Sequence, residues 1–501
     1  MCKNVKSEAE YLSVDYNGTV RSIVTSKNLK QLDLSDLGIQ DIAEIKNLEN
    51  LTQLQVLYLG RNEVSEIKNL ENLINLQHLV LNANQISKIE NLENLTQLQE
   101  LYLDYNQISE IQNLENLTQL QKLELSNNQI SEIKNLDNLS QLKTFSLHDN
   151  DISEIRNLDN LTKLEFIDLG NNQISEIKNL ENLKLLSALY LYGNRISEIK
   201  NLDDLTQLLI LYLDFNKISE IKNIENLTKL KGLYLHSNAV SEISNLENSK
   251  QLTSLFLGHN NITEIKNLEN LIQLQELSLG DQISEIRNLE KLKQLEGLNL
   301  GGNQISEIKN LETLTKLQRL DLSRNQISEI RNLEKLKQLQ GLILDGNQIS
   351  EIKNLETLTK LQRLDLSRNQ ISEIKNLEKL RQLQRLYLKE NQISKIENLE
   401  KLTQLKTLFL DHNQIIKIEG LEKLSQLIDL TLDSSLLLED DKEIYDRGSK
   451  AVIGHCKYQN LLEQLESIQK QINTSGLKLS DLQKLKKRAE EINKKIKSIK
   501  S

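Results

Sequence analysis

Leucine and isoleucine recur along most of the chain at fixed intervals, and the positions between them are mainly polar. The stretch 98–119, LQELYLDYNQISEIQNLENLTQ, shows the repeat, which reads LxxLxLxxNxIxxIxxLxxLxx over 22 residues. Seventeen full repeats begin between Leu54 and Leu405, with a degenerate repeat from Leu29 before them and a truncated one from Leu427 after them. A single repeat cannot bury its apolar stripe, so the pattern predicts an array in which each repeat is stabilised by stacking on its neighbours.

The fixed positions predict the local structure of a repeat. In LxxLxL the fourth and sixth residues alternate toward the interior as on a strand, so successive repeats should form a parallel sheet. The Asn at the ninth position, such as Asn106, can both donate and accept, and can satisfy the backbone of its own turn and the neighbouring one. In the outer segment, the Asn before the leucine, such as Asn113, is a candidate N-cap for a short helix. The sequence therefore predicts an α/β solenoid with a parallel sheet on one side and short helices on the other.

The two ends of the array differ from the repeats and predict caps, since a stacked array leaves its terminal cores exposed. Residues 1–28 carry alternating strand patterns around Asn17-Gly18, a pair typical of a tight β-hairpin turn. In residues 438–501 the apolar positions fall at helical spacing on both sides of an NTSG turn, which predicts an antiparallel helical pair. We therefore predict a β-hairpin cap over 1–28, the repeats over 29–437 and a helical cap over 438–501.

Two irregularities interrupt the repeats. The repeat from Leu274 is one residue short, and Asp281 stands where the ninth-position Asn should be. An ionised Asp only accepts hydrogen bonds, so the row of asparagines loses a donor there and a local kink is expected. Residues 295–338 and 339–382 match at 39 of 44 positions, which indicates a tandem duplication of two repeats.

This frame resembles the leucine-rich repeat pattern over about four-fifths of the chain, in particular the repeats of the phosphatase-1 regulatory subunit and of bacterial internalins. The resemblance implies a curved horseshoe with the sheet on its concave face, short helices on its convex side, and protein binding on the concave face. In the regulatory subunit, aromatic and acidic residues of that face hold a phosphatase catalytic subunit. Four residues here occupy matching positions: Tyr190, Tyr212, Tyr234 and Phe256. The Tyr-Arg and Pro-containing C-terminal cap of that subunit and the outer-segment Pro of the internalins are both absent.

The aromatic residues are concentrated at positions that should face away from the core. Of 17 aromatic residues, 12 occupy the third, fifth, seventh or eighth position of a repeat. They are Tyr58, Tyr102, Tyr105, Phe166, Tyr190, Tyr192, Tyr212, Phe215, Tyr234, Phe256, Tyr387 and Phe409. Because leucine supplies the core, these rings predict a surface that binds a protein partner, since each ring buries a large area for few frozen torsions. The alternative is an aromatic ladder that only stabilises the sheet by cross-strand stacking.

Two parts of this face are candidate binding sites. Four consecutive repeats place a ring at the fifth position, ~4.8 Å apart by strand spacing, in the order Tyr190, Tyr212, Tyr234 and Phe256. Around this row we expect Tyr192, Ile210, Phe215, His236 and His259. Later repeats carry a charged surface instead, with Arg319, Arg324, Arg363, Arg368, Arg385, Asp321 and Asp365. These charged side chains either pair among themselves or form a second binding site for the partner.

Composition and charge indicate which classes of partner are disfavoured and in which cellular compartment the protein is expected. The chain carries −10 overall, and residues 441–501 carry +6, so residues 1–440 carry −16. Phosphate contacts need concentrated Lys and Arg, so nucleic acid is disfavoured. The basic tail is either a solvated cap, or a coiled-coil contact with a partner or a second copy, or a contact with an anionic surface. With no N-terminal signal segment, no long apolar span and only Cys2 and Cys456 as cysteines, we expect a cytoplasmic protein without a membrane span.

The sequence contains few features that would indicate an enzyme. There is no phosphate-binding loop and no HExxH, paired CxxC or GxSxG motif, so we expect no enzyme activity, no cofactor and no metal. Asp214 and His236 fall in register on adjacent strands beside His259, and this group is either a solvated set on an interaction face or an acid–base or metal site. The predicted function is a non-enzymatic scaffold that binds a protein partner on its concave face. A phosphatase-1-like regulatory subunit and a surface adhesin are the alternatives.

Overall fold

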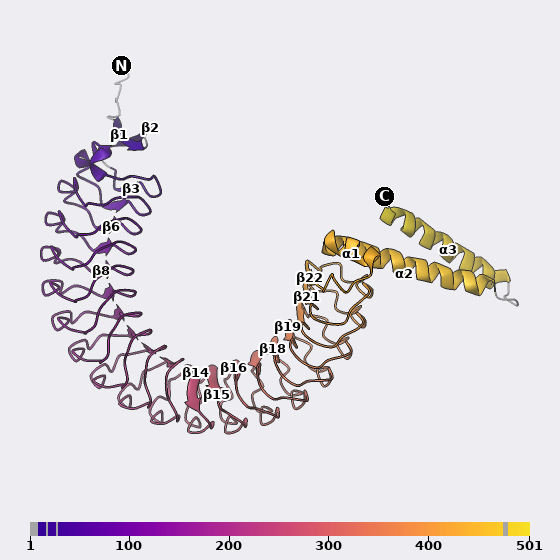
Figure 1. Ribbon diagram of the computed structural model, residues 1–501. Coiled ribbons are helices and arrows are strands. Elements are labelled where there is room, and N and C mark those ends of the chain that lie inside the picture. The colour runs from indigo at the N-terminus through magenta and orange to yellow at the C-terminus, as the bar shows by residue number, and fades with distance from the viewer. Residues whose placement is uncertain (1–8, 17–18, 27–28, 474–478, 501) are drawn as a thin grey trace, which may run out of the picture. The chain divides into compact units, whose positions relative to one another are not determined.

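The computed structural model describes residues 9–16, 19–26, 29–473 and 479–500, which belong to two compact units, Met1–Asn261 and Ile262–Ser501 (Figure 1). Each unit is built mainly from stacked repeats. Within each unit the strands line the inner side of its curve, which we call the concave face (Figure 1).

The first unit begins with an antiparallel hairpin. Strand β1 (Ala9–Tyr16) pairs with β2 (Thr19–Ser26) along their whole length. The expected hairpin is therefore present, while its Asn17-Gly18 turn lies outside the described residues. β1 also pairs with β4 (Ile45–Lys46), and this contact joins the hairpin to the degenerate first repeat.

Each repeat of the first unit contributes one short strand to a parallel sheet. The strands are β3 (Gln31–Asp33), β5 (Val56–Tyr58), β6 (His78–Val80), β7 (Glu100–Tyr102), β8 (Lys122–Glu124), β9 (Thr144–Ser146), β10 (Phe166–Asp168), β11 (Ala188–Tyr190), β12 (Ile210–Tyr212), β13 (Gly232–Tyr234) and β14 (Ser254–Ile262). Each pairs with the next without a shift of register. Residues at the same position of consecutive repeats therefore lie side by side.

The second unit is built from the same kind of repeat and ends in helices. Its strands are β15 (Glu276–Asp281), β16 (Gly297–Asn299), β17 (Arg319–Asp321), β18 (Gly341–Ile343), β19 (Arg363–Asp365), β20 (Arg385–Tyr387), β21 (Thr407–Phe409) and β22 (Asp429–Thr431). They pair in parallel from β15 to β22. The helices are α1 (Glu439–Asp446), α2 (Ser449–Ile472) and α3 (Leu479–Lys500).

The fixed leucines and isoleucines form the core of each unit. Leu101, Leu103 and Ile108 have no exposed surface, and their equivalents in the other repeats are buried in the same way. Phe145 takes the place of a core leucine and is also fully buried. Because each stripe is covered by the repeats before and after it, stacking between neighbours holds the array together.

Ninth-position asparagines join neighbouring repeats through buried hydrogen bonds. The Nδ2 of Asn106 donates to the carbonyls of Leu81 in the preceding repeat (3.0 Å), Leu103 (3.0 Å) and Asp104 (3.2 Å). Its Oδ1 accepts from the backbone N–H of Ile86 at 2.9 Å. Both ends of the amide are used, because backbone groups buried in a turn need partners. The same arrangement recurs along both units.

The outer side of the repeats consists of turns, and the predicted convex helices are wrong for the described repeats. The N–H of Leu117 donates to the carbonyl of Leu114, and that of Leu120 to Leu117, both at 2.9 Å. Buried leucines three residues apart require three residues per turn, so the segment does not reach the i→i−4 bonding of an α-helix. Among the described residues, short 3-10 helices occur at the degenerate start, as η1 (Ile42–Glu44) and η2 (Leu48–Asn50).

Asn113 is therefore not a helix N-cap. Its backbone is left-handed, with φ 58°, and its Nδ2 donates to the carbonyl of Ile89 in the preceding repeat at 2.8 Å. Asn tolerates this conformation because its short polar side chain can bond locally. Gly420 takes the same place and conformation in the repeat from Leu405. The sixteenth position thus forms a second row of hydrogen-bonding asparagines on the outer side.

The short repeat from Leu274 lies where the strands lengthen. β14 has nine residues and β15 six, in place of the three in the other repeats. In the second unit the asparagine row resumes directly after Asp281, since Asn303 donates to the carbonyl of Leu279 at 3.1 Å and accepts from the N–H of Ile283 at 2.8 Å. The kink expected at this repeat stays a prediction.

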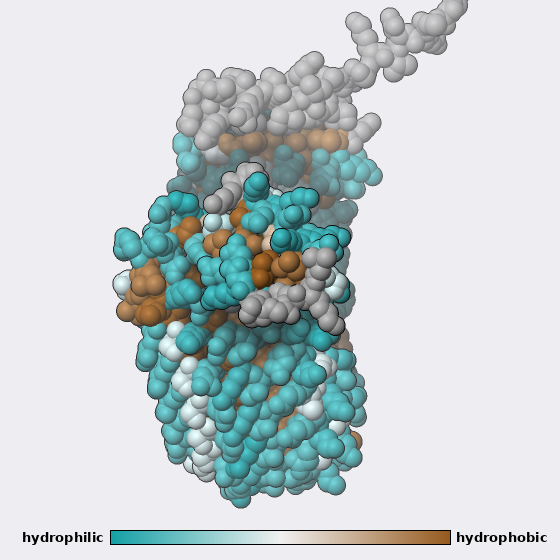
Figure 2. Space-filling model, turned by 90° about the vertical axis from the view of Figure 1, so that its right-hand side faces the viewer, coloured by the Kyte–Doolittle hydropathy of each residue, from teal (hydrophilic) through white to brown (hydrophobic). Residues whose placement is uncertain are grey.

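Helices α1 and α2 cover the last repeat, so the expected helical cap is present. Asp441 of α1 is buried and accepts a hydrogen bond from the backbone N–H of Ile418 at 2.9 Å. α3 folds back along α2 (Figure 1), and the two pack through Ile468, Ile492 and Ile496. Seen from this end, the repeats of the second unit present a mostly hydrophilic surface (Figure 2).

Candidate functional site

The concave face of the first unit carries rings from five successive repeats. We call them the aromatic cluster: Phe166, Tyr190, Tyr192, Tyr212, Phe215, Tyr234, His236, Phe256 and His259. They come from strands β10 to β14 and from the residues directly after β11 to β13 and at the end of β14. Register pairing brings the predicted row and most of its predicted surroundings together.

The rings of the fifth-position row contact one another. Tyr212 stacks on Tyr234 with ring centres 4.6 Å apart, and Tyr234 stacks on Phe256 at 5.1 Å with planes 10° apart. Tyr190 lies 5.4 Å from Tyr212, and Phe166 meets Tyr190 edge-on at 5.1 Å. These are favourable aromatic geometries, so a cross-strand ladder is present. Each ring of the row is only half-buried, so stacking does not use up its surface.

A second row of rings lies beside the first, at the seventh and eighth positions. Tyr192 meets Tyr212 edge-on at 5.5 Å, Phe215 meets His236 at 5.6 Å, and His236 meets His259 at 4.7 Å. The cluster is therefore two rows wide, which is broader than a ladder confined to one strand position.

Two glycines make room for the rings. A Cβ at Gly170 would collide with the ring of Tyr192 in the next repeat, and a Cβ at Gly232 would lie 2.8 Å from the ring of Tyr234. Only glycine lets a ring approach the backbone this closely. These glycines were not predicted as part of the site, although a Gly at a concave position near a Tyr of the same or the next repeat is a readable signal.

The eighth position holds exposed rings in an uncommon backbone conformation. Tyr105 and Phe215 both have φ 55° and expose 60% and 59% of their surface. A non-glycine residue in the left-handed region costs roughly 1–2 kcal/mol, and the same position is Gly193 or Gly302 in other repeats. A large ring is thus exposed to solvent at a position where glycine would adopt the backbone conformation at lower cost. This favours a role of the ring in interaction over a role in folding.

Ionisable groups among the rings are poorly solvated. Burial raises the pKa of Asp214 to about 6, although its bonds with the backbone N–H of His236, 2.6 Å from Oδ1, and with Tyr212 act in the opposite direction. Burial also raises the pKa values of the Tyr190 and Tyr212 hydroxyls. The hydroxyls of Tyr190 and Tyr212 are therefore uncharged at neutral pH.

A polar strip precedes the cluster and was not predicted from the sequence. The N–H of Ser126 donates to Asp104 Oδ1 at 3.0 Å, and its hydroxyl lies 2.7 Å from that of Ser146. The Nδ1 of His148 lies 3.6 Å from Asp168 Oδ2. Burial raises the pKa of Asp104 to about 6 and also raises that of Asp168. The readable signal was Ser, His and Asp at the fifth and seventh positions of consecutive repeats.

The remaining predicted aromatic and apolar residues lie outside the cluster. Tyr58 and Tyr102 lie on β5 and β7, and Ile210 lies on β12 opposite Gly232. Tyr387 and Phe409 form a separate edge-on pair in the second unit, with centres 5.3 Å apart.

The arginines of the second unit are partly paired. Arg319 forms an ion pair with Glu276, and an Nη2 of Arg363 lies 3.8 Å from Asp365 Oδ2. Arg385 makes no ion pair with any residue that the structure describes. Pairing therefore accounts for part of this charged surface and leaves cationic groups available.

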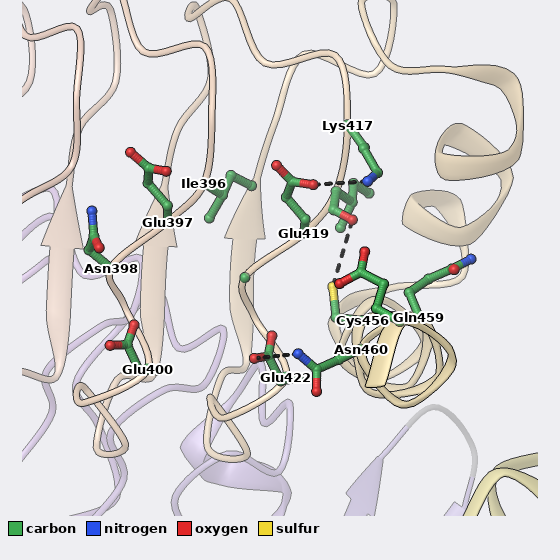
Figure 3. Close-up of a pocket in the computed structure, with 13 residues that line it drawn as sticks. Ile396, Glu397, Asn398, Glu400, Lys417, Glu419, Glu422, Cys456, Gln459 and Asn460 are labelled. Atoms are coloured by element: carbon green, nitrogen blue, oxygen red, sulfur yellow. Dashed lines mark hydrogen bonds and ion pairs between the residues drawn. The ribbon is translucent and has the colours of Figure 1, made fainter. Parts of the chain in front are cut away.

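A hollow of about 320 Å³ lies between α2 and the outer side of the last repeats (Figure 3). Cys456 reaches the carbonyl of Ile418 at 3.9 Å, and the Nδ2 of Asn460 lies 3.4 Å from Glu422 Oε1. Burial raises the pKa of the Cys456 thiol to about 12, so this thiol is no nucleophile at neutral pH. We interpret the hollow as the junction between the cap and the repeats.

Within the described ranges, His, Cys, Asp and Glu side chains nowhere gather in threes where they could hold a metal ion. Asp214 accepts from the backbone of His236, so the pair is part of the hydrogen bonding of the concave face. None of the described helices combines the length and the apolar character that crossing a membrane requires.

Stacked parallel strands on a leucine core, joined by asparagine rows, define the class of fold. The sequence profile of leucine-rich repeats (two copies) matches residues 52–94, 96–138, 140–182, 250–292, 293–335, 337–379 and 381–423. The chain therefore belongs to the leucine-rich repeat family, whose members bind protein partners. No curated protein matches the chain.

Solved structures support the same family. An internalin from Listeria monocytogenes is 34% identical with a TM-score of 0.56, covering 60% of this chain and 90% of its own. A leucine-rich repeat protein from Leptospira interrogans is 32% identical with a TM-score of 0.64, covering 68% and 90%. The ectodomain of the Arabidopsis thaliana receptor kinase GASSHO1/SCHENGEN3, solved with Casparian strip integrity factor 2, is 26% identical with a TM-score of 0.51, covering 81% and 62%.

Proposed function

We propose that this chain is a non-enzymatic interaction protein that binds a protein partner on the concave face of its first unit, through the aromatic cluster. One observation carries the proposal: rings from five repeats gather on one face where the core does not need them, because leucine already fills it. Tyrosine and other aromatic side chains dominate the energetics of protein interfaces.

Two features favour binding over a ladder that only stabilises the sheet. Beyond Phe256 the fifth position becomes Ser278, Asn299 and Asp321, so the row stops although the second unit also has a parallel sheet. Phe215 stays mostly exposed in a left-handed turn, where it adds little to folding. Stacking fixes the row before a partner arrives, which lowers the entropy lost on binding.

Membership of the leucine-rich repeat family supports a role in protein interaction. A surface adhesin stays a second candidate, predicted from the sequence. The matching of aromatic positions favours a phosphatase-1-like regulatory subunit as a narrower form of the first. A location in the cytoplasm stays a prediction from the sequence.

A pull-down that compares the wild type with Tyr212→Ala/Tyr234→Ala tests the proposal. We expect the double variant to lose its partners, because a central interface ring is worth about 2 kcal/mol, roughly a thirtyfold change in affinity for each residue. The matched control is Tyr387→Ala/Phe409→Ala, which removes another contacting ring pair in the second unit. Partners retained by the first variant, or lost equally by both folded variants, would contradict the proposal.

A further inference from the structure

A hollow of about 220 Å³ opens on the concave face of the second unit, around Gly341. Its walls come from the second and third positions of four consecutive repeats: Gln318, Arg319, Gln340, Gly341, Gln362, Arg363, Gln384 and Arg385. No carboxylate lines it, and its walls carry three arginines and four glutamines. The guanidinium of Arg319 is turned to Glu276, so Arg363 and Arg385 supply the cationic groups that remain for a ligand. A Cβ added at Gly341 would meet no atom within 4 Å, so the glycine is the floor of the hollow.

The duplication supplies a comparison within the same unit. Gly297 is the counterpart of Gly341 in the first copy, and the space above it is filled. The carboxylate of Glu276 lies directly over Gly297, and its Oε1 pairs with Arg319 on the far side. The chain thus places one of its own carboxylates over a concave glycine beside an arginine.

The second copy has the same glycine and different neighbours. The repeat before Gly297 carries Glu276, whereas the repeat before Gly341 carries Arg319. On the other side, Arg363 and Arg385 follow in the next two repeats. A site that is closed by an internal carboxylate in the first copy is therefore open and cationic in the second.

We propose that the hollow over Gly341 binds a carboxylate side chain from an acidic segment of a protein partner. The proposal rests on the proposed function in that a protein docks on a concave face. A planar guanidinium fork matches the two oxygens of a carboxylate, and Glu276 shows such a group in the equivalent place.

Arg363, one of the arginines that would hold the carboxylate, is positioned in advance. The guanidinium carbon of Arg363 lies 5.2 Å from the centre of the Tyr387 ring, and Asp365 holds one of its nitrogens at 3.8 Å. Arg385 stands one repeat further on without an ion-pair partner among the described residues. Because Arg363 is already oriented, binding freezes little further motion in that side chain. Gln318 donates to Glu296 and accepts from Gln340, so the amides of Gln362 and Gln384 are the ones that can bond the backbone of the acidic segment.

Fluorescence anisotropy with a labelled hexaglutamate peptide tests the proposal on the full chain at low salt. We expect Gly341→Leu, which fills the hollow, and Arg363→Gln/Arg385→Gln, which removes its charge, each to weaken binding at least tenfold. The matched control, Arg324→Gln/Arg381→Gln, removes the same charge from exposed places outside the hollow and should change the affinity less than about twofold. Circular dichroism verifies that the variants are folded.

Three results would overturn the proposal. The first is unchanged affinity in both hollow variants, and the second is an equal loss in the control. The third is that a phosphoserine peptide binds more tightly than hexaglutamate and loses its binding in Gly341→Leu, because the hollow would then be a phosphate-binding site. Tyr212→Ala/Tyr234→Ala should keep hexaglutamate binding, so failure of the aromatic proposal is distinguishable from failure of this one.

Discussion

Asparagines of a single repeat provide a sharp test of how the array is held together. Asn106→Ala leaves the buried N–H of Ile86 without its acceptor at 2.9 Å and removes two 3.0 Å bonds to the carbonyls of Leu81 and Leu103. Each carbonyl keeps a bond from the asparagine of its own or the following repeat, so neither is orphaned. An unsatisfied buried donor costs about 1–3 kcal/mol and the weakened carbonyl bonds somewhat less, so we expect a loss of about 3 kcal/mol.

The same repeat offers two further asparagines as graded controls. Asn116 is exposed and donates to the carbonyl of Glu93 at 3.3 Å, so Asn116→Ala should cost below about 1 kcal/mol. Asn113 bonds the carbonyl of Ile89 and also has a left-handed backbone, which alanine adopts at a cost. Asn113→Ala should therefore lower the free energy of unfolding by about 2–3 kcal/mol. Asn113→Gly should cost about 1 kcal/mol, because glycine accepts the backbone and loses only the bond.

Hydrogen exchange followed by mass spectrometry measures these costs locally, which suits an array whose repeats need not unfold together. Asn106→Ala should speed exchange at Ile86 and its neighbours by roughly a hundredfold, since 1.4 kcal/mol corresponds to a factor of ten. Asn116→Ala should change it by less than about fivefold. If Asn116→Ala has the larger effect, or if exchange at Ile86 is unchanged in Asn106→Ala, the buried hydrogen bonds are not what joins the repeats.

Four further predictions follow from the structure. The pKa of Asp214 rises from 3.8 to about 6 in the folded protein, so its ionisation costs stability, and stability should fall as pH rises from about 4 to about 6. Asp214→Asn should reduce that fall, leaving the part that Asp104 contributes, and should melt higher than wild type at pH 7.5. Gly170→Ala should displace the ring of Tyr192 and lower the melting temperature, with weaker partner capture in the pull-down; equal behaviour to wild type would contradict the ring placement. Cys456 should resist iodoacetamide at pH 8 in the folded protein and react in denaturant, as mass spectrometry would show. Glu276→Ala should open a second hollow and strengthen hexaglutamate binding severalfold by anisotropy.

The sequence predicted which residues form the candidate site, but it did not predict the contacts between their side chains. The period of 22 placed Tyr190, Tyr212, Tyr234 and Phe256 at one position, and register pairing makes them neighbours. The ring geometry, from near-parallel stacking to edge-on contact, depends on side-chain torsions that no periodicity encodes. The hollow over Gly341 was likewise hidden, because it depends on which side chain leans over which glycine.

The outer segments show why one prediction was wrong. Asn113 before an apolar run is a common sign of a helix start, but here the buried leucines are three residues apart. That three-residue spacing could be read from the sequence, and it favours turns. An α-helix does not form in the outer segment, because its 3.6-residue period would move one leucine out of the core.

The sequence by itself determined the repeat, the parallel sheet, the asparagine rows and the face on which the aromatic residues lie. These follow from a strict period, because every repeat meets the same neighbours in the same register. Only the tertiary structure decided how the variable residues of that face use the space between the repeats. Glu276 closes the gap over Gly297 while Gly341 stays open between arginines, and Tyr192 lies against Gly170. The physical reason is that these contacts join residues one or two repeats apart, where the size and reach of each side chain decide which space is filled.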